Sequence, residues 1–241
     1  MSRFMIRRSL MAFALVPCLM PAFAGQPDPA STVHAIITHP EGAPVPQSYM
    51  AKLMAWRAAR LVSNAQVLAA QPGQDKPGFA AVTVLDFRNE AAFGQWRETA
   101  QKQLGATTRI RRADVVRSEG KRPPASSEPV YVVSFYDTLV SPDEYKTYTD
   151  RYILPNMHSQ QGFGVMGRYA MYLEREPGGA KGRSVLVMEY VDQAAFVRRD
   201  EVKKLGSKVL LADPQWKQYN EIKSTIRTHT SEAVASALKL N

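Results

Sequence analysis

Cysteine is almost absent from this sequence, whose 241 residues include only Cys18. A single cysteine excludes a disulfide framework within the chain. Cys18 lies in an N-terminal segment that we expect to be removed, so the remaining protein lacks a thiol nucleophile and cysteine ligands for zinc or an iron–sulfur cluster. The four histidines form neither an HExxH motif nor a close pair. We therefore expect no metal site.

Acidic residues are fewer than basic ones, 22 against 31, and the formal net charge is +9. One short stretch, residues 109–112 (Arg-Ile-Arg-Arg), concentrates basic side chains. Neither a glycine-rich phosphate loop nor a base-stacking motif accompanies it. We therefore predict no nucleic-acid partner. The stretch is expected on an exposed strand face or a sheet edge, where charges discourage unwanted pairing.

The first 24 residues have the three parts of a secretory signal peptide. Arg3, Arg7 and Arg8 form a basic head, residues 10–19 are mostly apolar, and a small Ala-Phe-Ala sequence ends at Ala24. The apolar run is too short for a permanent membrane helix, which needs about 20 residues. We expect cleavage after Ala24 and a periplasmic or secreted protein with no membrane association. Cleavage leaves 217 residues with a net charge of +6, because the segment holds three arginines and no acidic residue.

The chain matches itself at an offset near 103 residues. Residues 82–87 (Val-Thr-Val-Leu-Asp-Phe) align with residues 185–190 (Val-Leu-Val-Met-Glu-Tyr), and an Ala-Ala-Phe sequence follows both. Acid aligns with acid and aromatic with aromatic. A tandem repeat of this length indicates two halves with the same order of elements.

Each half is predicted to contain β-α-β-β-α-β, the split βαβ or ferredoxin-like motif. Apolar, β-branched runs mark the strands, and polar capping residues mark the helix starts. In the first half we expect strands at 33–38, 65–70, 79–87 and 107–116 and helices at 46–63 and 89–104. In the second half we expect strands at 130–136, 164–174, 184–191 and 225–234 and helices at 141–158, 192–211 and 215–222.

The chain therefore divides into a signal peptide and two similar halves. A four-stranded sheet of this kind covers one face with its helices and leaves the other bare, and two bare faces can pack together. We predict an α+β fold in which two fused ferredoxin-like units form an intramolecular barrel with a lumen. The predicted segments are the signal peptide (1–24), a flexible lead-in (25–31), the first half (32–117), a linker (118–128), the second half (129–236) and a tail (237–241).

Two short motifs in the second half support this architecture. Residues 143–148 (Asp-Glu-Tyr-Lys-Thr-Tyr) are followed by Pro155 and Gly162, and residues 211–216 read Leu-Ala-Asp-Pro-Gln-Trp. These motifs resemble the dimeric α/β-barrel superfamily, which includes the EthD, NIPSNAP and antibiotic-biosynthesis monooxygenase families. The resemblance implies the fold over roughly residues 32–235. The superfamily includes cofactor-free monooxygenases, isomerases, haem enzymes and proteins without known activity, so the resemblance selects no reaction.

The third strand of each half offers a candidate carboxylate. Alternate strand residues face opposite sides, and the more apolar set, which includes Leu85 and Met188, is expected under the helices. The other set places Asp86 and Glu189 in the lumen at equivalent positions. A carboxylate in an apolar lumen can act as a general acid or base. The alternative is that each is solvated at the rim or paired with an arginine.

Three histidines are further candidates. His34 lies in an apolar strand on the parity of Ile36, where it is either a lumen base or a hydrogen-bonded core residue. His229 lies on the last strand and is expected to face the lumen. His158 lies at the end of a predicted helix, near the place where EthD-like proteins carry a functional histidine, so the resemblance implies a catalytic role for it. His39 is expected in a loop.

Arg168 and Tyr172 share one face of a strand, and Tyr131 is the equivalent of His34 in the second half. On the lumen side these residues would bind an acidic or phenolic ligand, and Arg168 would neutralise Glu189. The alternative is an exposed arginine and a packed tyrosine.

Together these residues predict an exported enzyme that performs acid/base chemistry on a small apolar or aromatic molecule without a cofactor. The alternative is a barrel that binds its ligand without turnover, or that binds haem through an axial histidine. The sequence leaves open a monomer or a homodimer. The catalytic candidates are His34, Asp86, Glu189 and His158; the ligand-binding candidates are Tyr131, Arg168, Tyr172 and His229; His158 and His229 are the candidate haem ligands.

Overall fold

The computed structural model describes residues 33–42, 44–104, 108–124, 126–175 and 182–240. The predicted signal peptide, the lead-in and the turn expected at 176–181 lie outside these residues. The first half contains β1 (Val33–His39), α1 (Gln47–Ala58), β2 (Asn64–Ala70), β3 (Ala81–Phe87), α2 (Glu90–Leu104) and β4 (Arg109–Gly120). The second half contains β5 (Val130–Thr138), α3 (Pro142–Tyr148), the π-helical turn η2 (Thr149–Ile153), α4 (Leu154–Gly162), β6 (Met166–Glu174), β7 (Arg183–Tyr190), α5 (Gln193–Leu210), α6 (Pro214–Ile226) and β8 (Arg227–Leu238).

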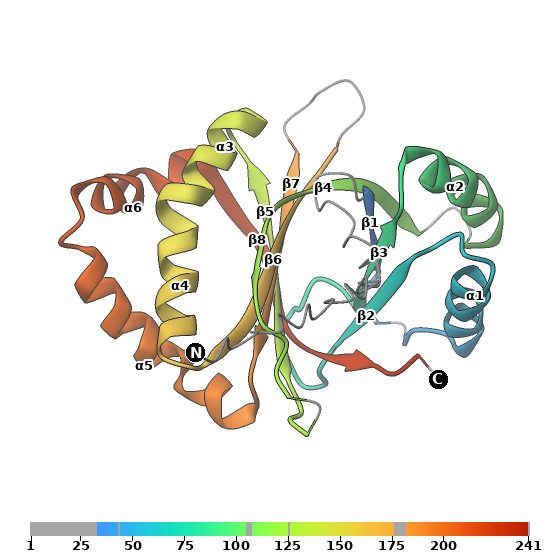
Figure 1. The fold of residues 1–241 in the computed structure, drawn as a ribbon, viewed down its shortest axis with the longest axis horizontal. Coiled ribbons are helices and arrows are strands. Elements are labelled where there is room, and N and C mark those ends of the chain that lie inside the picture. Colours follow the sequence, from blue (N-terminus) through green and yellow to red (C-terminus); the bar gives the residue numbers. More distant parts are fainter. Residues whose placement is uncertain (1–32, 43, 105–107, 125, 176–181, 241) are drawn as a thin grey trace, which may run out of the picture.

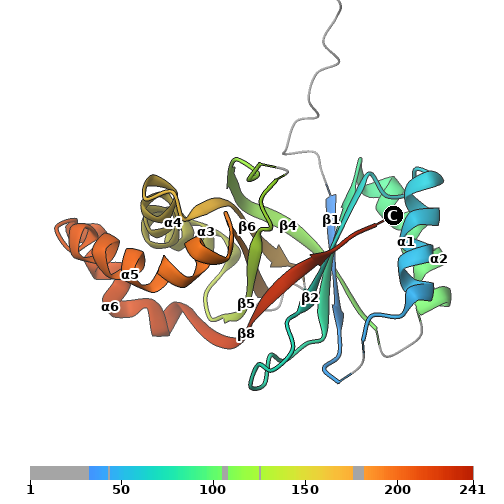
Figure 2. The same ribbon diagram turned by 90° about the horizontal axis from the view of Figure 1, so that it is seen from below.

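The eight strands form one closed barrel in the order β1-β3-β2-β8-β5-β7-β6-β4. All neighbouring strands are antiparallel, and the two halves join where β2 pairs with β8 and β4 pairs with β6. Helices α1 and α2 cover one outer side, and α3 to α6 cover the opposite side (Figures 1 and 2). The predicted fold of two fused ferredoxin-like units is confirmed.

Local sequence signals explain where the helices of the second half begin. Ser141 and Glu144 form a capping box, in which each side chain bonds the backbone N–H of the other residue. Asp192 accepts a hydrogen bond from the Ala195 N–H at the start of α5. Asp213 does the same at α6, where Pro214 occupies the first turn. These caps satisfy N–H groups that a helix start leaves without partners.

Apolar side chains separate into layers as the strand alternation predicts. Leu85 packs with Trp96 under the helices of the first half. Val84 and Val187 lie in a second cluster, which fills the lumen. Met188 belongs to a third cluster under the helices of the second half. The expected assignment of strand faces to helices and lumen is thus confirmed, and it fixes which polar side chains can reach the lumen.

Strand β4 differs from the expected strand in its extent. Residues 109–113 pair with β1, whereas the pairing with β6 begins at Ala113. The basic stretch at 109–112 therefore lies where the strand register has a partner on one side only. The strand also continues to Gly120, so residues 118–120 of the expected linker are part of the sheet.

His39 also differs from its expected place. It ends β1 and is buried on the helix side, with Nε2 at 3.2 Å from Thr83 Oγ1. Burial lowers the pKa of His39. His39 is thus part of the packing and not of a loop.

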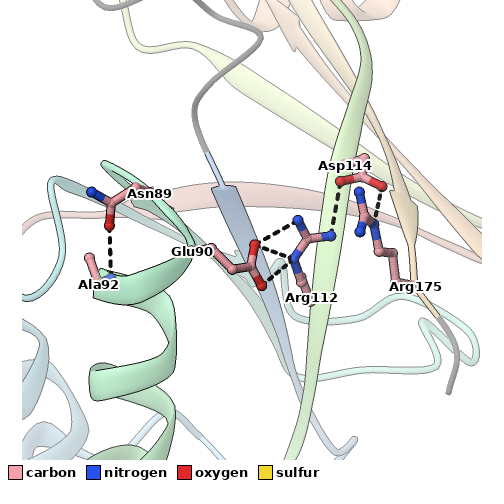
Figure 3. Close-up of polar contacts among 6 residues, drawn as sticks. All are labelled: Asn89, Glu90, Ala92, Arg112, Asp114 and Arg175. Carbon is pink, nitrogen blue, oxygen red and sulfur yellow. Dashed lines mark hydrogen bonds and ion pairs between the residues drawn. The ribbon is translucent and has the colours of Figure 1, made fainter.

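A chain of ion pairs crosses β4 and links the two halves (Figure 3). Arg112 lies between Glu90 of α2 and Asp114, with N···O distances of 2.8 Å and 3.1 Å. Asp114 also pairs with Arg175, which follows β6. Surface pairs of this kind contribute little individually, but here they connect α2 of the first half with the end of a second-half strand.

Within the described ranges, no helix combines the length and the apolar character that a membrane span requires.

Gly120 gives a test of how the halves join. Its φ is +101°, and a Cβ there would overlap the Gly167 carbonyl oxygen and the Arg168 Cα. We expect Gly120→Ala to lower the free energy of unfolding by at least about 3 kcal/mol, because strain and overlap add. Gly73→Ala is the matched control, since its φ is +81° but no atom lies within 4 Å of the new Cβ. We expect it to cost about 1 kcal/mol in urea denaturation. Equal losses would contradict the close approach of β4 to β6.

Candidate functional site

A cavity of about 290 Å³ lies in the lumen near one mouth of the barrel. Its volume is at the lower end of the range for small-molecule sites. The other end of the lumen is filled, since Phe79 packs on Phe135 and Arg183 lies between Phe135 and the buried Glu174. The lining residues are His34, Asn64, Gln66, Val84, Asp86, Val115, Ser118, Arg168, Tyr169, Ala170, Tyr172, Val187 and Glu189.

In the first half, three polar residues lie side by side on neighbouring strands. The register places His34 of β1 opposite Asp86 of β3, and Asp86 opposite Asn64 of β2. His34 Nδ1 is 2.8 Å from Asp86 Oδ1, and Asn64 Nδ2 donates to Asp86 Oδ2 at 2.9 Å. An ionised carboxylate only accepts hydrogen bonds, so this arrangement places the proton of a neutral His34 on Nδ1 and leaves the lone pair on Nε2.

In the second half, the equivalent positions hold Tyr131 of β5, Glu189 of β7 and Arg168 of β6. Tyr131 lies opposite Glu189, and Glu189 lies opposite Arg168. Arg168 Nε donates to Glu189 Oε2 in an ion pair. The Glu189 side chain is only 2% exposed, whereas Arg168 is 33% exposed. Arg168 therefore compensates a buried charge while part of its guanidinium remains accessible at the mouth.

Two tyrosines complete this part of the lumen. The ring of Tyr172 meets that of His34 edge to face, with centroids 5.5 Å apart. Burial raises the pKa of Tyr172, and the charge of Asp86 raises it further. Burial and the nearby charge of Glu189 raise the pKa of Tyr131 to about 12. Both phenols are thus protonated at neutral pH and can donate hydrogen bonds, but they cannot act as bases.

The cavity combines groups for proton transfer with groups for anion binding. His34 offers Nε2 to a ligand, and Asp86 can balance the charge of an imidazolium. Arg168 offers a cation, and Tyr172 adds a neutral donor. With His34 neutral, these two carboxylates and one guanidinium leave a single net negative charge. The arrangement can therefore remove a proton and stabilise the anion that results.

Five of the eight predicted site residues line this one cavity: His34, Asp86, Arg168, Tyr172 and Glu189. Tyr131 lies in the lumen cluster beside Glu189. The chemical roles that the sequence suggests for them remain predictions.

His158 lies outside the cavity. In α4 the neighbouring Met157 is buried against the sheet, whereas the His158 side chain is 53% exposed and pairs with Glu119 at 2.7 Å. The expectation that it shares the site is not met. Its place on the helix surface follows from the helix phase, which the π-helical turn before α4 also shifts.

His229 lies outside the cavity because of a β-bulge. Phe135 is paired with Ser231, but the next residue, Tyr136, is paired with His229, so Thr230 is left out of the register. A bulge of one residue moves the following side chain to the other face of the sheet. His229 therefore packs edge to face on Tyr136, at 5.3 Å between centroids, on the side away from the lumen.

Asn64 is a lining residue that the sequence-based candidates miss. It opens a short strand, and nothing in its neighbourhood marks it as functional. The signal lies in the pairing register, which brings it against Asp86 as it brings Arg168 against Glu189. The repeat offset of 103 that aligns Asp86 with Glu189 would align Asn64 with Gly167, and the register shift before Arg168 brings Arg168 to the equivalent place instead.

The described residues contain no group of three or more metal-binding side chains. Haem, the alternative cofactor, needs an axial ligand such as a histidine. The two proposed ligands, His158 and His229, both lie outside the lumen. The lining histidine, His34, is not among the proposed haem ligands; its Nδ1 is bonded to Asp86 and its Nε2 keeps a lone pair. The residues that line the cavity therefore do not supply the ligation that the sequence suggests for haem.

No protein-family model and no curated protein matches this sequence. Among solved structures, the chain is similar to a candidate monooxygenase from Fusobacterium nucleatum, with 13% identity, a TM-score of 0.54, and coverage of 87% of this chain and 94% of the other. It is also similar to an anthrone oxidase-like protein, with 8% identity, a TM-score of 0.52, and coverage of 87% and 92%. Identities this low show a shared fold. These similarities confirm the fold that the sequence resemblance implies.

The buried ion pair gives a test of the site's electrostatics. Arg168→Ala leaves the buried Glu189 carboxylate without its cation, so we expect a loss of about 3 kcal/mol in the free energy of unfolding at pH 7. Arg175→Ala is the control, because Arg175 is 59% exposed beside Asp114, and we expect it to cost less than about 1 kcal/mol. Urea denaturation measures both. A loss for Arg168→Ala no larger than that of the control would show that Glu189 does not depend on this guanidinium.

Proposed function

We propose that this protein is an enzyme that performs cofactor-independent acid/base chemistry on a small apolar or aromatic molecule in the barrel lumen. The observation that carries the proposal is that a histidine–carboxylate pair and an arginine–carboxylate pair line one cavity of about 290 Å³. Apolar lining from Val84, Ala170 and Val187 favours a ligand with an apolar body.

His34 is the proposed base. Asp86 holds its Nδ1–H, so Nε2 is free to accept a proton from the ligand. The imidazolium that forms is stabilised by the Asp86 carboxylate at hydrogen-bond distance. Because the His34 side chain is only 10% exposed, water competes little for this nitrogen. In this proposal the proton moves from a ligand C–H or O–H to Nε2, and the electron pair stays on the ligand as an anion.

Arg168 and Tyr172 are the proposed binding groups for the anion left on the ligand. A guanidinium strongly stabilises charge that develops on an oxygen atom in a site shielded from water. Glu189 holds Arg168 in place through the ion pair. The protonated phenol of Tyr172 adds a neutral donor beside His34. Glu189 and Tyr131 in this account shape the binding side of the cavity and do not remove protons.

The test begins with mass spectrometry of small molecules that co-purify with the protein, followed by turnover assays on the molecule recovered. We expect His34→Gln to lower turnover by roughly 10²–10⁴-fold, the usual contribution of a positioned general base. Asp86→Asn should lower it by a similar factor, because it removes the charge that stabilises the imidazolium. His158→Gln is the control and should leave turnover unchanged, since His158 lies outside the cavity.

Three results would contradict the enzyme proposal. The recovered molecule could be bound tightly and returned unchanged, which would support a binding protein. His34→Gln could retain full turnover. Addition of haem could produce a Soret band that His158→Gln or His229→Gln abolishes, which would support the haem alternative.

We also propose that the protein is exported and cleaved after Ala24. The basic head, short apolar run and Ala-Phe-Ala end of residues 1–24 support this. Expression of the full sequence in a bacterium should yield a periplasmic protein whose first residue is Gly25, as read by N-terminal sequencing. An uncleaved chain retained in the cytoplasm would contradict the proposal.

A further inference from the structure

We propose that Asn64 is a positioning residue that keeps the Asp86 carboxylate aligned on His34 and leaves the charge of Asp86 available to an imidazolium. The inference rests on the proposed function, because it assigns the proton-transfer step to the first half. It concerns one hydrogen-bonded chain that runs from Asn64 through Asp86 to His34.

Both oxygens of Asp86 have a partner. Oδ1 is 2.8 Å from His34 Nδ1, and Oδ2 accepts from Asn64 Nδ2 at 2.9 Å. Ser63 binds the backbone of the same residue. Its N–H and its Oγ both donate hydrogen bonds to the Asp86 carbonyl oxygen, at 2.8 Å and 2.7 Å. A carboxylate fixed at both oxygens cannot turn about its last bond without losing a bond. Asn64 therefore restrains the plane in which Asp86 meets the imidazole.

The second half shows what a different residue does at this position. There the same three places hold Tyr131, Glu189 and Arg168. Arg168 bonds the carboxylate through Nε as an ion pair, and the residue on the first strand is a tyrosine that stays protonated. The three residues are paired in the same order in both halves, but the β6–β7 register shifts by one residue just before Arg168, whereas the β2–β3 register at Asn64 is unbroken. The halves therefore differ in the three side chains and in this bulge.

The charge of the residue beside the carboxylate is a second difference, in addition to the exchange of His34 for Tyr131. Asn64 donates one neutral hydrogen bond and leaves the negative charge of Asp86 to stabilise an imidazolium on His34. An arginine there compensates that charge with its own, as Arg168 does for Glu189. The first half is thus suited to proton transfer, and the second half to holding a cation at the cavity.

Three variants test this. Asn64→Leu keeps a similar volume but removes the donor. Asn64→Arg introduces the residue of the second half. Gln66→Leu is the matched control, because Gln66 lines the same cavity from the same strand, two residues further along on the same face. Asn64 is exposed at the mouth, so each variant should retain the urea midpoint of the original protein.

The readout is the tautomer of neutral His34, from ¹⁵N NMR of histidine-labelled protein, with His34→Gln used to assign the signal. We expect the proton on Nδ1 in the original protein and in Gln66→Leu. In Asn64→Leu and Asn64→Arg we expect loss of this preference and a shift toward the Nε2–H form that free histidine favours. Retention of the Nδ1–H signal in both Asn64 variants, or its absence from the original protein, overturns the inference.

This measurement needs no substrate, so it separates two kinds of failure. An original protein with the Nδ1–H tautomer but no turnover of the recovered molecule contradicts the proposed function and leaves the positioning role intact. Where turnover is found, Asn64→Leu should lower kcat with little change in KM, since Asn64 acts through Asp86. A change confined to KM would instead make Asn64 a binding residue and overturn its assignment as a positioning residue.

Discussion

Closure of the barrel is the constraint on which the rest of the structure depends. Each four-stranded sheet buries one face under helices, and its other face would be exposed if the halves separated. Pairing of β2 with β8 and of β4 with β6 turns the two bare faces into one lumen. Every lumen side chain must then fill space or find a polar partner. Phe79, Phe135 and the buried Arg183–Glu174 ion pair fill one end, and two other polar pairs line the cavity near the other end.

Duplication within that closed frame explains why the site is asymmetric. The two halves place equivalent residues around a single cavity, so neither half has a complete site of its own. Change at three equivalent positions has produced a histidine–carboxylate pair on one side and an arginine–carboxylate pair on the other. Both carboxylates are partnered, which limits the cost of burying them. The remaining hydrogen-bonding capacity of His34 and Arg168 is available to a ligand.

The sequence predicts the architecture and part of the site. Four kinds of residue position show which structural features could and could not be predicted from it. Strand alternation was enough to place Asp86 and Glu189 in the lumen, because an unbroken strand keeps its parity. It was not enough for His229, because the bulge at Thr230 reverses the parity and leaves no clear mark in the sequence. The direction in which His158 points depends on the phase of helix α4, and the π-helical turn before α4 shifts that phase. Asn64 becomes meaningful only through its register with Asp86, a contact between residues distant in the chain.

The central claim is that the two halves share one ligand site at the His34 and Arg168 mouth of the barrel. The most direct test is a crystal structure of the purified protein with the small molecule that co-purifies with it. The account predicts the molecule inside the lumen, with one of its atoms at hydrogen-bond distance from His34 Nε2 and another near the Arg168 guanidinium. A ligand bound elsewhere, such as in the groove between α4 and α5 beside Phe163 and Val209, would contradict the account.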